Sequence, residues 1–222
     1  MNTLEELFEH LNESDMVEVS GYPYPMLWSK ELGIGHLPLL DSPENDSVYD
    51  REYFDKYVEM SKTFDGFRLN MARQRQLRFS FPYTTSILDV GIGSGMFCDS
   101  IGADGTDVNP YAVRWLKENG KLAPEDEQYQ VITMWDVLEH IPDPTDILSR
   151  ATRGLCISMP IYRGIEHIMV SKHLRINEHC WYFTNQGIKN YLKLFGFNRV
   201  LLESTIESDI CREDILSYTF AR

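Results

Sequence analysis

The residues best placed to do chemistry form one short stretch, in which an aspartate precedes three glycines at alternate positions. Asp89 lies inside the apolar run 87–90, and Gly91, Gly93 and Gly95 follow it. This pattern is typical of a buried parallel strand, a tight turn and the start of a helix. Glycines at such a turn let a ligand lie close to the backbone, and the first N–H groups of the helix point at that ligand. The stretch therefore predicts a site for a nucleotide-like cofactor.

The spacing of the glycines disfavours a dinucleotide. The dinucleotide fingerprint needs its third glycine at position 96, where this chain has the bulky Met96. A buried carboxylate at Asp89 would repel a pyrophosphate, whereas it suits a ligand with positive charge. On these residues the chain resembles the class I S-adenosylmethionine-dependent methyltransferases, whose first motif is an acidic residue followed by G-x-G-x-G. The resemblance assigns cofactor binding to Asp89, Gly91, Ile92, Gly93 and Gly95.

A second polar motif, Asp107-Val108-Asn109-Pro110, follows an expected second strand and precedes an expected helix over 111–119. A carboxylate at the tip of a second strand commonly binds ribose hydroxyls. The motif is similar to the second motif of the family, and the resemblance places Asp107 on the ribose and Val108 beside it. The structural alternative is that Asp107 only caps the next helix.

The third motif, Asp136-Val137-Leu138-Glu139-His140, leads from a buried strand over 129–135 into a polar loop. It resembles the fourth strand of the methyltransferase sheet and its loop. The resemblance places Asp136 and Val137 near the methionine part of the cofactor, and Glu139 and His140 on the acceptor side. Alternatively, Glu139 and His140 only pack and cap within the loop.

Three of the six histidines fall in the segment 161–184, which we interpret as the acceptor loop. Its end, Glu178-His179-Cys180-Trp181-Tyr182-Phe183-Thr184, resembles a stretch of small-molecule and glycan-directed methyltransferases, and its aromatic residues suggest a wall for the acceptor. A hydroxyl acceptor needs a base, and histidine has a suitable pKa. We expect His140 to be that base, with His179 as second choice.

A metal-dependent alternative involves Asp136, Glu139 and His140, joined by His173 or His179. This set is similar to the metal ligands of the small-RNA terminal 2′-O-methyltransferases, and it suits a divalent ion. The same string also occurs in methyltransferases that bind no metal, and an acidic protein disfavours RNA. We therefore expect a site without metal.

The resemblance implies a Rossmann-like, doubly wound α/β fold with a mainly parallel sheet that ends in an antiparallel hairpin. We expect a fifth strand over 155–160, stopped by Pro160, and a helix over 185–194. An antiparallel hairpin, 199–206 and 214–221, with a short polar turn should close the sheet. Only about ten residues separate the helix ending near Asn119 from the next strand, so the third strand should be shortened or missing. This leaves adenine recognition open.

The residues before the first motif strand predict an extension. Residues 2–13 predict a small amphipathic helix, and residues 17–40 predict a hairpin or loop. Residues 42–47 indicate a connector, and residues 50–78 have a helical pattern. We divide the chain into an N-terminal lid or extension over 1–80, which does not fold independently, and a methyltransferase domain over 81–222. On the lid helix, Arg73 or Arg75 is a candidate for the carboxylate of the cofactor, although a surface role is the commoner fate of an arginine.

Composition limits the class of protein. The chain has 222 residues, 43% of them hydrophobic, and a formal net charge of −13. This charge repels polyanions, so we expect no extended nucleic-acid footprint. The four cysteines form no C-x-x-C pair, and neither a signal peptide nor an apolar run long enough for a membrane is evident. We therefore expect a cytoplasmic protein.

The leading hypothesis is an S-adenosylmethionine-dependent methyltransferase that acts on a small or glycan-like acceptor, with oxygen as the expected methylated atom. The short third strand motivates an alternative, a non-catalytic cofactor-binding or interaction module. A nicotinamide oxidoreductase is disfavoured by Asp89, Met96 and the terminal hairpin. The oligomeric state is not indicated by the sequence.

Overall fold

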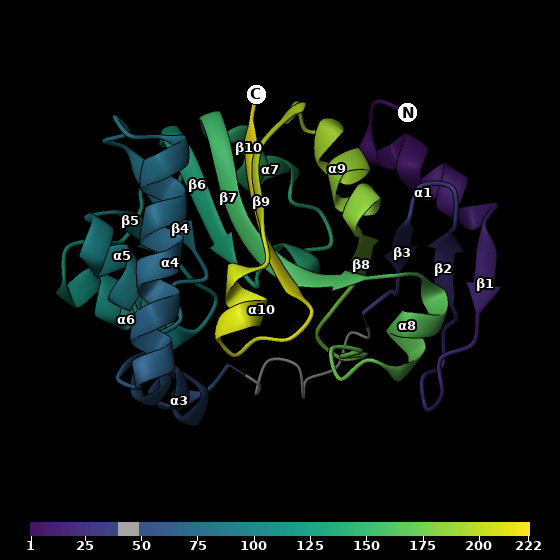
Figure 1. Ribbon diagram of the computed structural model, residues 1–222, viewed down its shortest axis with the longest axis horizontal. Helices are drawn as coiled ribbons and strands as arrows, with labels where there is room; N and C mark the ends of the chain where they lie inside the picture. The colour runs from purple at the N-terminus through teal and green to yellow at the C-terminus, as the bar shows by residue number, and fades with distance from the viewer. Residues whose placement is uncertain (40–48) are drawn as a thin grey trace.

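The computed structural model describes residues 1–39 and 49–222, and the expected connector over 42–47 lies outside these residues. The described residues form one sheet flanked by helices (Figure 1). The strands are β1 Asp15–Val17, β2 Met26–Ser29, β3 Ile34–His36, β4 Ile87–Val90, β5 Asp104–Thr106, β6 Tyr129–Trp135, β7 Ala151–Tyr162, β8 Trp181–Thr184, β9 Arg199–Ser204 and β10 Ile215–Ala221. The helices are α1 Leu4–Asn12, α3 Arg51–Ser61, α4 Phe64–Ser80, α5 Met96–Ile101, α6 Pro110–Glu118, η1 Leu138–His140, α7 Thr145–Ser149, α8 Ile165–Val170, α9 Asn185–Lys193 and α10 Ile206–Ile210.

The strands that carry the motifs form the parallel centre of the sheet. β4 pairs in parallel with β5 on one side and β6 on the other, and β6 pairs in parallel with β7. β10 lies antiparallel between β7 and β9. This arrangement confirms the predicted Rossmann-like sheet and its terminal antiparallel hairpin. Because the carboxyl ends of β4, β5 and β6 meet at one edge, the three motifs that follow these strands also meet there.

Alternating side chains divide the core between the two faces of the sheet. On β4, Ile87 packs with α4 and α5 residues on one face, while Leu88 and Val90 belong to the larger core on the other. β6 alternates in the same way, with Val131 on the first face and Ile132 on the second. Both faces of the central strands are therefore buried, as a doubly wound sheet requires.

The expected loss of the third strand is confirmed. Beyond β5, a single parallel bridge joins Gly105 to Leu122. Gly105 donates its N–H to the Lys121 carbonyl and accepts a hydrogen bond from the Ala123 N–H, at 2.8 and 2.9 Å. Residues 121–123 therefore satisfy the outer edge of β5 at Gly105 in place of a full strand.

The N-terminal segment extends the sheet at its far side. β1, β2 and β3 form an antiparallel meander, and β3 pairs antiparallel with β8. β8 in turn pairs in parallel with the last residues of β7, Ile161 and Tyr162. The expectation that Pro160 stops the fifth strand is therefore wrong. β7 continues through Pro160 because its final residues gain a new partner in β8.

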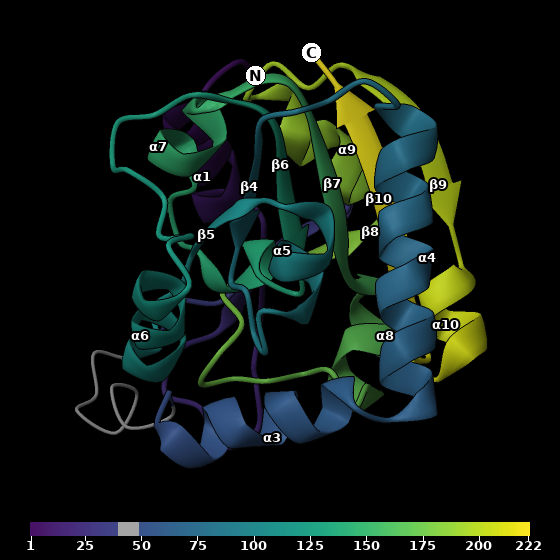
Figure 2. The same cartoon turned by 90° about the vertical axis from the view of Figure 1, so that its left-hand side faces the viewer.

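The expected helical segment 50–78 consists of two helices. α3 ends at Ser61, and Thr63 caps α4 by accepting a hydrogen bond from the Gly66 N–H at 3.0 Å. A Cβ on Gly66 would lie 2.2 Å from the Met60 carbonyl, so the corner needs glycine. The corner lays α3 across the carboxyl ends of the parallel strands while α4 runs beside the sheet (Figure 2).

The N-terminal residues lie in two places. α1 packs Leu7 and Leu11 into the larger core, whereas α3 covers the carboxyl edge on the other side of the molecule (Figure 1). The division at residue 80 stays a prediction.

The polar turn expected between the last two strands contains a short helix, α10. Among the described residues, no helix combines the length and apolar character needed to cross a bilayer.

Candidate active site

The glycine turn after β4 has the backbone that its sequence predicts. Gly91, Gly93 and Gly95 all have positive φ, at 70°, 55° and 77°. A Cβ on Gly91 would lie 2.4 Å from Cγ2 of Val137, so the turn also packs tightly against the loop after β6. Gly95 precedes α5, whose first N–H groups therefore face the same edge.

Asp89 is buried at the end of β4 with 1% of its surface exposed. Its Oδ1 accepts a hydrogen bond from the Thr133 hydroxyl at 2.7 Å, across the β4–β6 pair. Burial raises the pKa of Asp89 to about 7, although the Thr133 hydrogen bond and the charge of Arg73 oppose this shift. A cationic ligand beside Asp89 would favour its ionised form.

Asp107 lies just after β5 and turns back toward the glycine turn. Its Oδ2 accepts a hydrogen bond from the Gly93 N–H at 3.3 Å, and its Oδ1 accepts one from the Asn109 N–H at 2.8 Å. Burial raises the pKa of Asp107, and these backbone hydrogen bonds oppose the rise. Asn109, not Asp107, caps α6 by accepting from the Tyr111 N–H. The capping alternative for Asp107 is therefore wrong. Val108 is 77% exposed.

A cavity of about 320 Å³ lies between the glycine turn and α3. It is lined by residues of the glycine turn, α3, α4 and the chain's end, including Asp89, Gly91, Ile92, Gly93, Trp135, Asp136, Lys56, Tyr57, Met60, Arg73, Arg175 and Arg212. Gly95, Asp107, Val108 and Val137 lie outside this lining, so the predicted cofactor residues divide between the cavity wall and its surroundings.

Tyr57 of α3 covers the glycine turn. A Cβ on Gly93 would lie 3.3 Å from the Tyr57 ring, and the Tyr57 hydroxyl is 3.2 Å from that of Tyr53. The ring of Tyr49, just before this helix, is followed by those of Tyr53 and Tyr57 on it, with successive centroids 5.3 and 5.0 Å apart. The apolar stripe of α3 divides between two surroundings, because Phe54 packs against the core whereas Tyr57 and Met60 line the cavity.

Asp136 has an uncommon left-handed backbone, with φ of 58°, at the point where β6 ends. Its side chain forms ion pairs with Arg212 and, at 3.5 Å, with Arg73. Both arginines also bind Glu207 of α10, Arg73 through two parallel hydrogen bonds of 2.8 Å. The strained aspartate is thus held by a network from α4 and the chain's end, a common arrangement at functional sites.

Glu207 is fully buried within this network. Burial alone would raise its pKa, but the charges and hydrogen bonds of Arg73 and Arg212 hold it at about 2. Sequence reasoning missed Glu207 and Arg212 because they lie in the presumed polar turn, far along the chain from Asp136. No local signal indicates them, since only the return of the terminal hairpin brings them to the cavity.

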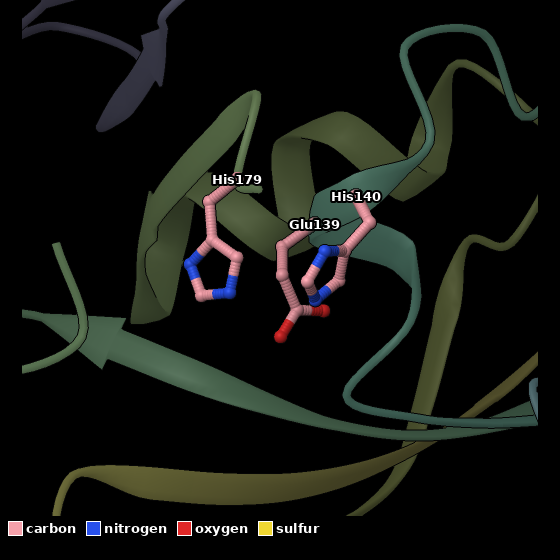
Figure 3. A group of neighbouring side chains, drawn as sticks. All are labelled: Glu139, His140 and His179. Atoms are coloured by element: carbon pink, nitrogen blue, oxygen red, sulfur yellow. The ribbon is translucent and has the colours of Figure 1, made fainter. Parts of the chain in front are cut away.

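The two predicted catalytic histidines lie together, beside Glu139 (Figure 3). The ring centroids of His140 and His179 are 4.5 Å apart and nearly perpendicular. One ligand atom from each of the three residues lies within 4.8 Å of the others. Burial lowers the pKa of His140 and, with the charge of His140, lowers that of His179 to about 2. Both imidazoles are therefore neutral near pH 7.

Other sequence candidates lie elsewhere. The His173 ring hydrogen-bonds the Glu213 carbonyl at 2.9 Å and is not in the histidine cluster. Arg75 lines a separate groove beside α10, whereas Arg73 lines the cavity. The expectation that aromatic residues of this segment form a wall for the acceptor is wrong, because Trp181, Tyr182 and Phe183 are buried in β8.

Comparison with known proteins agrees with this geometry. Residues 64–202 match the family model described as "Methyltransferase domain". A ubiquinone biosynthesis O-methyltransferase of Photobacterium profundum is 28% identical over 131 residues, which cover 49% of this chain. They cover 52% of that protein, so the chain spans about half the length of the curated relative it matches.

Two solved structures share the fold at low identity. Magnesium protoporphyrin IX methyltransferase from Synechocystis PCC 6803, with S-adenosylhomocysteine bound, has a TM-score of 0.56 and 14% identity, covering 80% of this chain and 97% of that one. The N-methyltransferase NodS from Bradyrhizobium japonicum WM9, with the same ligand, has a TM-score of 0.52 and 12% identity, covering 77% and 97%. By its sequence match, supported by this fold, the chain belongs to the methyltransferase domain family, within the class I S-adenosylmethionine-dependent methyltransferases.

Proposed function

We propose that the protein transfers a methyl group from S-adenosylmethionine to oxygen of a small-molecule acceptor. The observation that carries this proposal is the cavity at the carboxyl edge of the sheet. Asp89, the glycine turn and Asp136 line it from the sheet, and Tyr57 covers it from α3. A covered site excludes water from the sulfonium cofactor and holds the acceptor in line with the methyl group.

Three charged residues each bind a different part of the cofactor. Asp107 binds the ribose hydroxyls, because its carboxylate lies beside the Gly93 N–H at the tip of β5. Arg73 binds the carboxylate of the methionine part with the edge that Glu207 does not occupy. Asp89 supplies negative charge beneath the glycine turn and favours a cationic ligand.

The cluster of Glu139, His140 and His179 belongs to the acceptor side. Without an added ion, His140 is the better base of the two histidines, because it is half-buried whereas His179 is only 3% exposed. His140 takes the proton of the acceptor hydroxyl as that oxygen bonds to the methyl carbon. The carbon–sulfur bond breaks, its electron pair stays on sulfur, and S-adenosylhomocysteine leaves uncharged.

Two observations support oxygen and a small acceptor. The relative that matches half of the chain is named as an O-methyltransferase of ubiquinone biosynthesis. The chain also has a formal charge of −13, which disfavours polyanionic acceptors. A glycan-like acceptor remains within the proposal because of the resemblance of residues 178–184 to glycan-directed methyltransferases.

Methyl transfer from labelled S-adenosylmethionine tests the proposal on matched panels of phenols, sugars and amines. We expect label on a hydroxyl acceptor and a loss of at least about a hundredfold in His140→Ala, the low end for a general base. His173→Ala is the control, since its ring lies outside the cluster. Label on amines alone would contradict oxygen transfer, and cofactor binding without transfer to any acceptor would favour the non-catalytic module.

A further inference from the structure

Glu139 is a buried carboxylate without a compensating charge. It is 2% exposed, and neither carboxylate oxygen has a hydrogen-bond partner in the part of the chain that the structure describes. No ion pair involves it among residues 1–39 and 49–222. Glu207, the other buried glutamate, is held by two arginines. Since an unpaired buried charge is costly, Glu139 requires a proton or a cation.

The Glu139 carboxylate lies beside two imidazoles, each of which has a ring nitrogen without a partner. His140 Nδ1 and His179 Nδ1 form no hydrogen bond with any described residue. Figure 3 shows the Glu139 side chain between the two rings, with all three side chains converging on one region. Their ligand atoms lie within 4.8 Å of one another. Ligands bound at about 2.0–2.2 Å to one ion in a tetrahedral site are about 3.4 Å apart, so the three side chains must rotate toward one another to bind it.

We infer that Glu139, His140 and His179 bind one divalent transition-metal ion. One carboxylate and two imidazoles suit Mn²⁺, Fe²⁺, Co²⁺ or Zn²⁺ better than Mg²⁺, which prefers oxygen ligands. The sequence alone favours a site without metal, and it cannot show that these ligand atoms are buried, adjacent and unpartnered. Two residues of the metal-binding set that the sequence suggested are not part of this site. Asp136 is ion-paired with arginines, and His173 lies apart from the cluster.

Hydrogen bonds hold the two ligand-bearing segments together. The Glu139 carbonyl accepts from the Cys180 N–H at 2.9 Å and from its thiol at 3.3 Å. The Trp181 indole donates to the Ile141 carbonyl at 3.0 Å. η1 and the start of β8 are thus joined on both sides of the ligands. A metal site gains affinity from such fixed geometry.

The cations around the cluster are already paired. Arg175 binds Glu178 at 3.0 Å, and Arg212 binds Asp136 and Glu207. Glu139 therefore remains the anion available to an added ion. Three protein ligands leave coordination positions open for the acceptor oxygen.

The role of the ion rests on the proposed function. The ion would make an acceptor hydroxyl bound to it more acidic, so that the hydroxyl would lose its proton to water as its oxygen bonds to the methyl carbon and the carbon–sulfur bond breaks. His140 would then act as a ligand and not as the base. The binding site itself does not depend on methyl transfer.

Titration of the metal-free protein with Co²⁺ tests the site, because the visible spectrum reports nitrogen and oxygen ligation directly. Calorimetry with Mn²⁺ and Zn²⁺ gives stoichiometry. We expect one ion per chain and binding at least about tenfold weaker in Glu139→Gln, His140→Ala and His179→Gln. His173→Ala should bind as the native protein does. Thermal unfolding without metal checks that each variant is folded.

Absence of stoichiometric binding to the folded native protein, or equally tight binding in Glu139→Gln, would overturn the inference. Cofactor titration in chelator separates this failure from failure of the proposed function. A protein that binds S-adenosylmethionine but no metal retains the proposed function and loses only the ion. Methyl transfer that is unchanged in chelator would remove the catalytic role while leaving the binding site.

Discussion

The buried carboxylate of Asp89 favours binding of a cationic cofactor but lowers the stability of the cofactor-free protein near neutral pH. Its carboxylate is buried, with a single side-chain hydrogen bond from Thr133. Burial raises its pKa from 3.8 to about 7. Between these values the folded protein holds a proton that the unfolded chain has released. The Asp89 contribution to the free energy of unfolding therefore falls as pH rises through this window.

Asp89→Asn removes this titration, so we predict that the variant gains stability relative to the native protein as pH rises from 4 to 7. Urea unfolding at several pH values measures the difference. The same variant should bind S-adenosylmethionine more weakly, because the buried negative charge is lost. An unchanged pH dependence together with unchanged affinity would contradict the assigned role of Asp89.

Gly91 permits a direct comparison between backbone strain and a side-chain clash. Gly91 and Gly102 both have left-handed backbones, with φ of 70° and 67°. A Cβ at Gly102 meets nothing within 4 Å, whereas one at Gly91 lies 2.4 Å from Val137. We predict that Gly102→Ala costs about 1 kcal/mol in the free energy of unfolding.

Gly91→Ala should cost more than Gly102→Ala and should also weaken cofactor binding, because Val137 must move. Chemical unfolding and cofactor titration of the two variants give the comparison. Equal losses of stability in both variants, with cofactor affinity retained in Gly91→Ala, would show that the contact with Val137 is unimportant.

Local sequence predicted the residues whose partners are close in sequence or fixed by strand pairing. The positions of Asp89 and the glycine turn follow from one apolar run, and that of Asp107 from the end of the next strand. The partners of Asp136 are different. Arg73 comes from a helix before the sheet and Arg212 from the terminal hairpin, so only the assembled fold shows them.

At the scale of elements, the Arg73–Glu207–Arg212 network joins α4 and α10 to the loop after β6. We predict that Glu207→Gln costs about 3–5 kcal/mol in the free energy of unfolding, because two arginines lose a buried partner. Urea unfolding measures the loss. Glu203→Gln is the matched control, since its ion pair with Lys189 is partly exposed and worth at most about 1 kcal/mol.

The same network gives a pH signature. The pKa of Glu207 is about 2 in the fold against 4.5 in the unfolded chain, so its stabilising contribution is present above pH 4.5. It is lost as pH falls toward 2. Glu207→Gln should lose the native protein's steep fall in stability over that range. A native-like acid transition in the variant would assign the transition to other carboxylates.

Elements were predictable where periodicity and order along the chain determine them. The central strands, the terminal hairpin and the missing third strand belong to this group. The pairing of β8 with β3 was not predictable, because it joins residues about 150 positions apart and depends on short strands. The parallel pairing of β8 with β7 explains why Pro160 fails to stop β7. The corner at Thr63 depends on the close approach of Gly66 to Met60, which the helical pattern conceals.

At the scale of the molecule, the N-terminal residues belong to the main core and not to a detachable cover. Leu7 and Leu11 of α1 are fully buried against the sheet. We predict that Leu11→Ala lowers the free energy of unfolding by about 2–5 kcal/mol in one cooperative transition. Met16→Ala, at a residue 71% exposed, should change it little. A separate early transition for the N-terminal segment would contradict this integration.

The central claim is that the cavity beneath α3 binds S-adenosylmethionine through the carboxyl ends of β4, β5 and β6. Calorimetric titration with S-adenosylmethionine tests it most directly. The proteins compared are the native protein, Asp107→Ala and, as a control at an exposed residue, Asp146→Ala. We predict micromolar binding to the native protein and the control, and binding at least about tenfold weaker, or about 1.4 kcal/mol, in Asp107→Ala. No binding at millimolar cofactor, or equal binding in Asp107→Ala, would contradict the account.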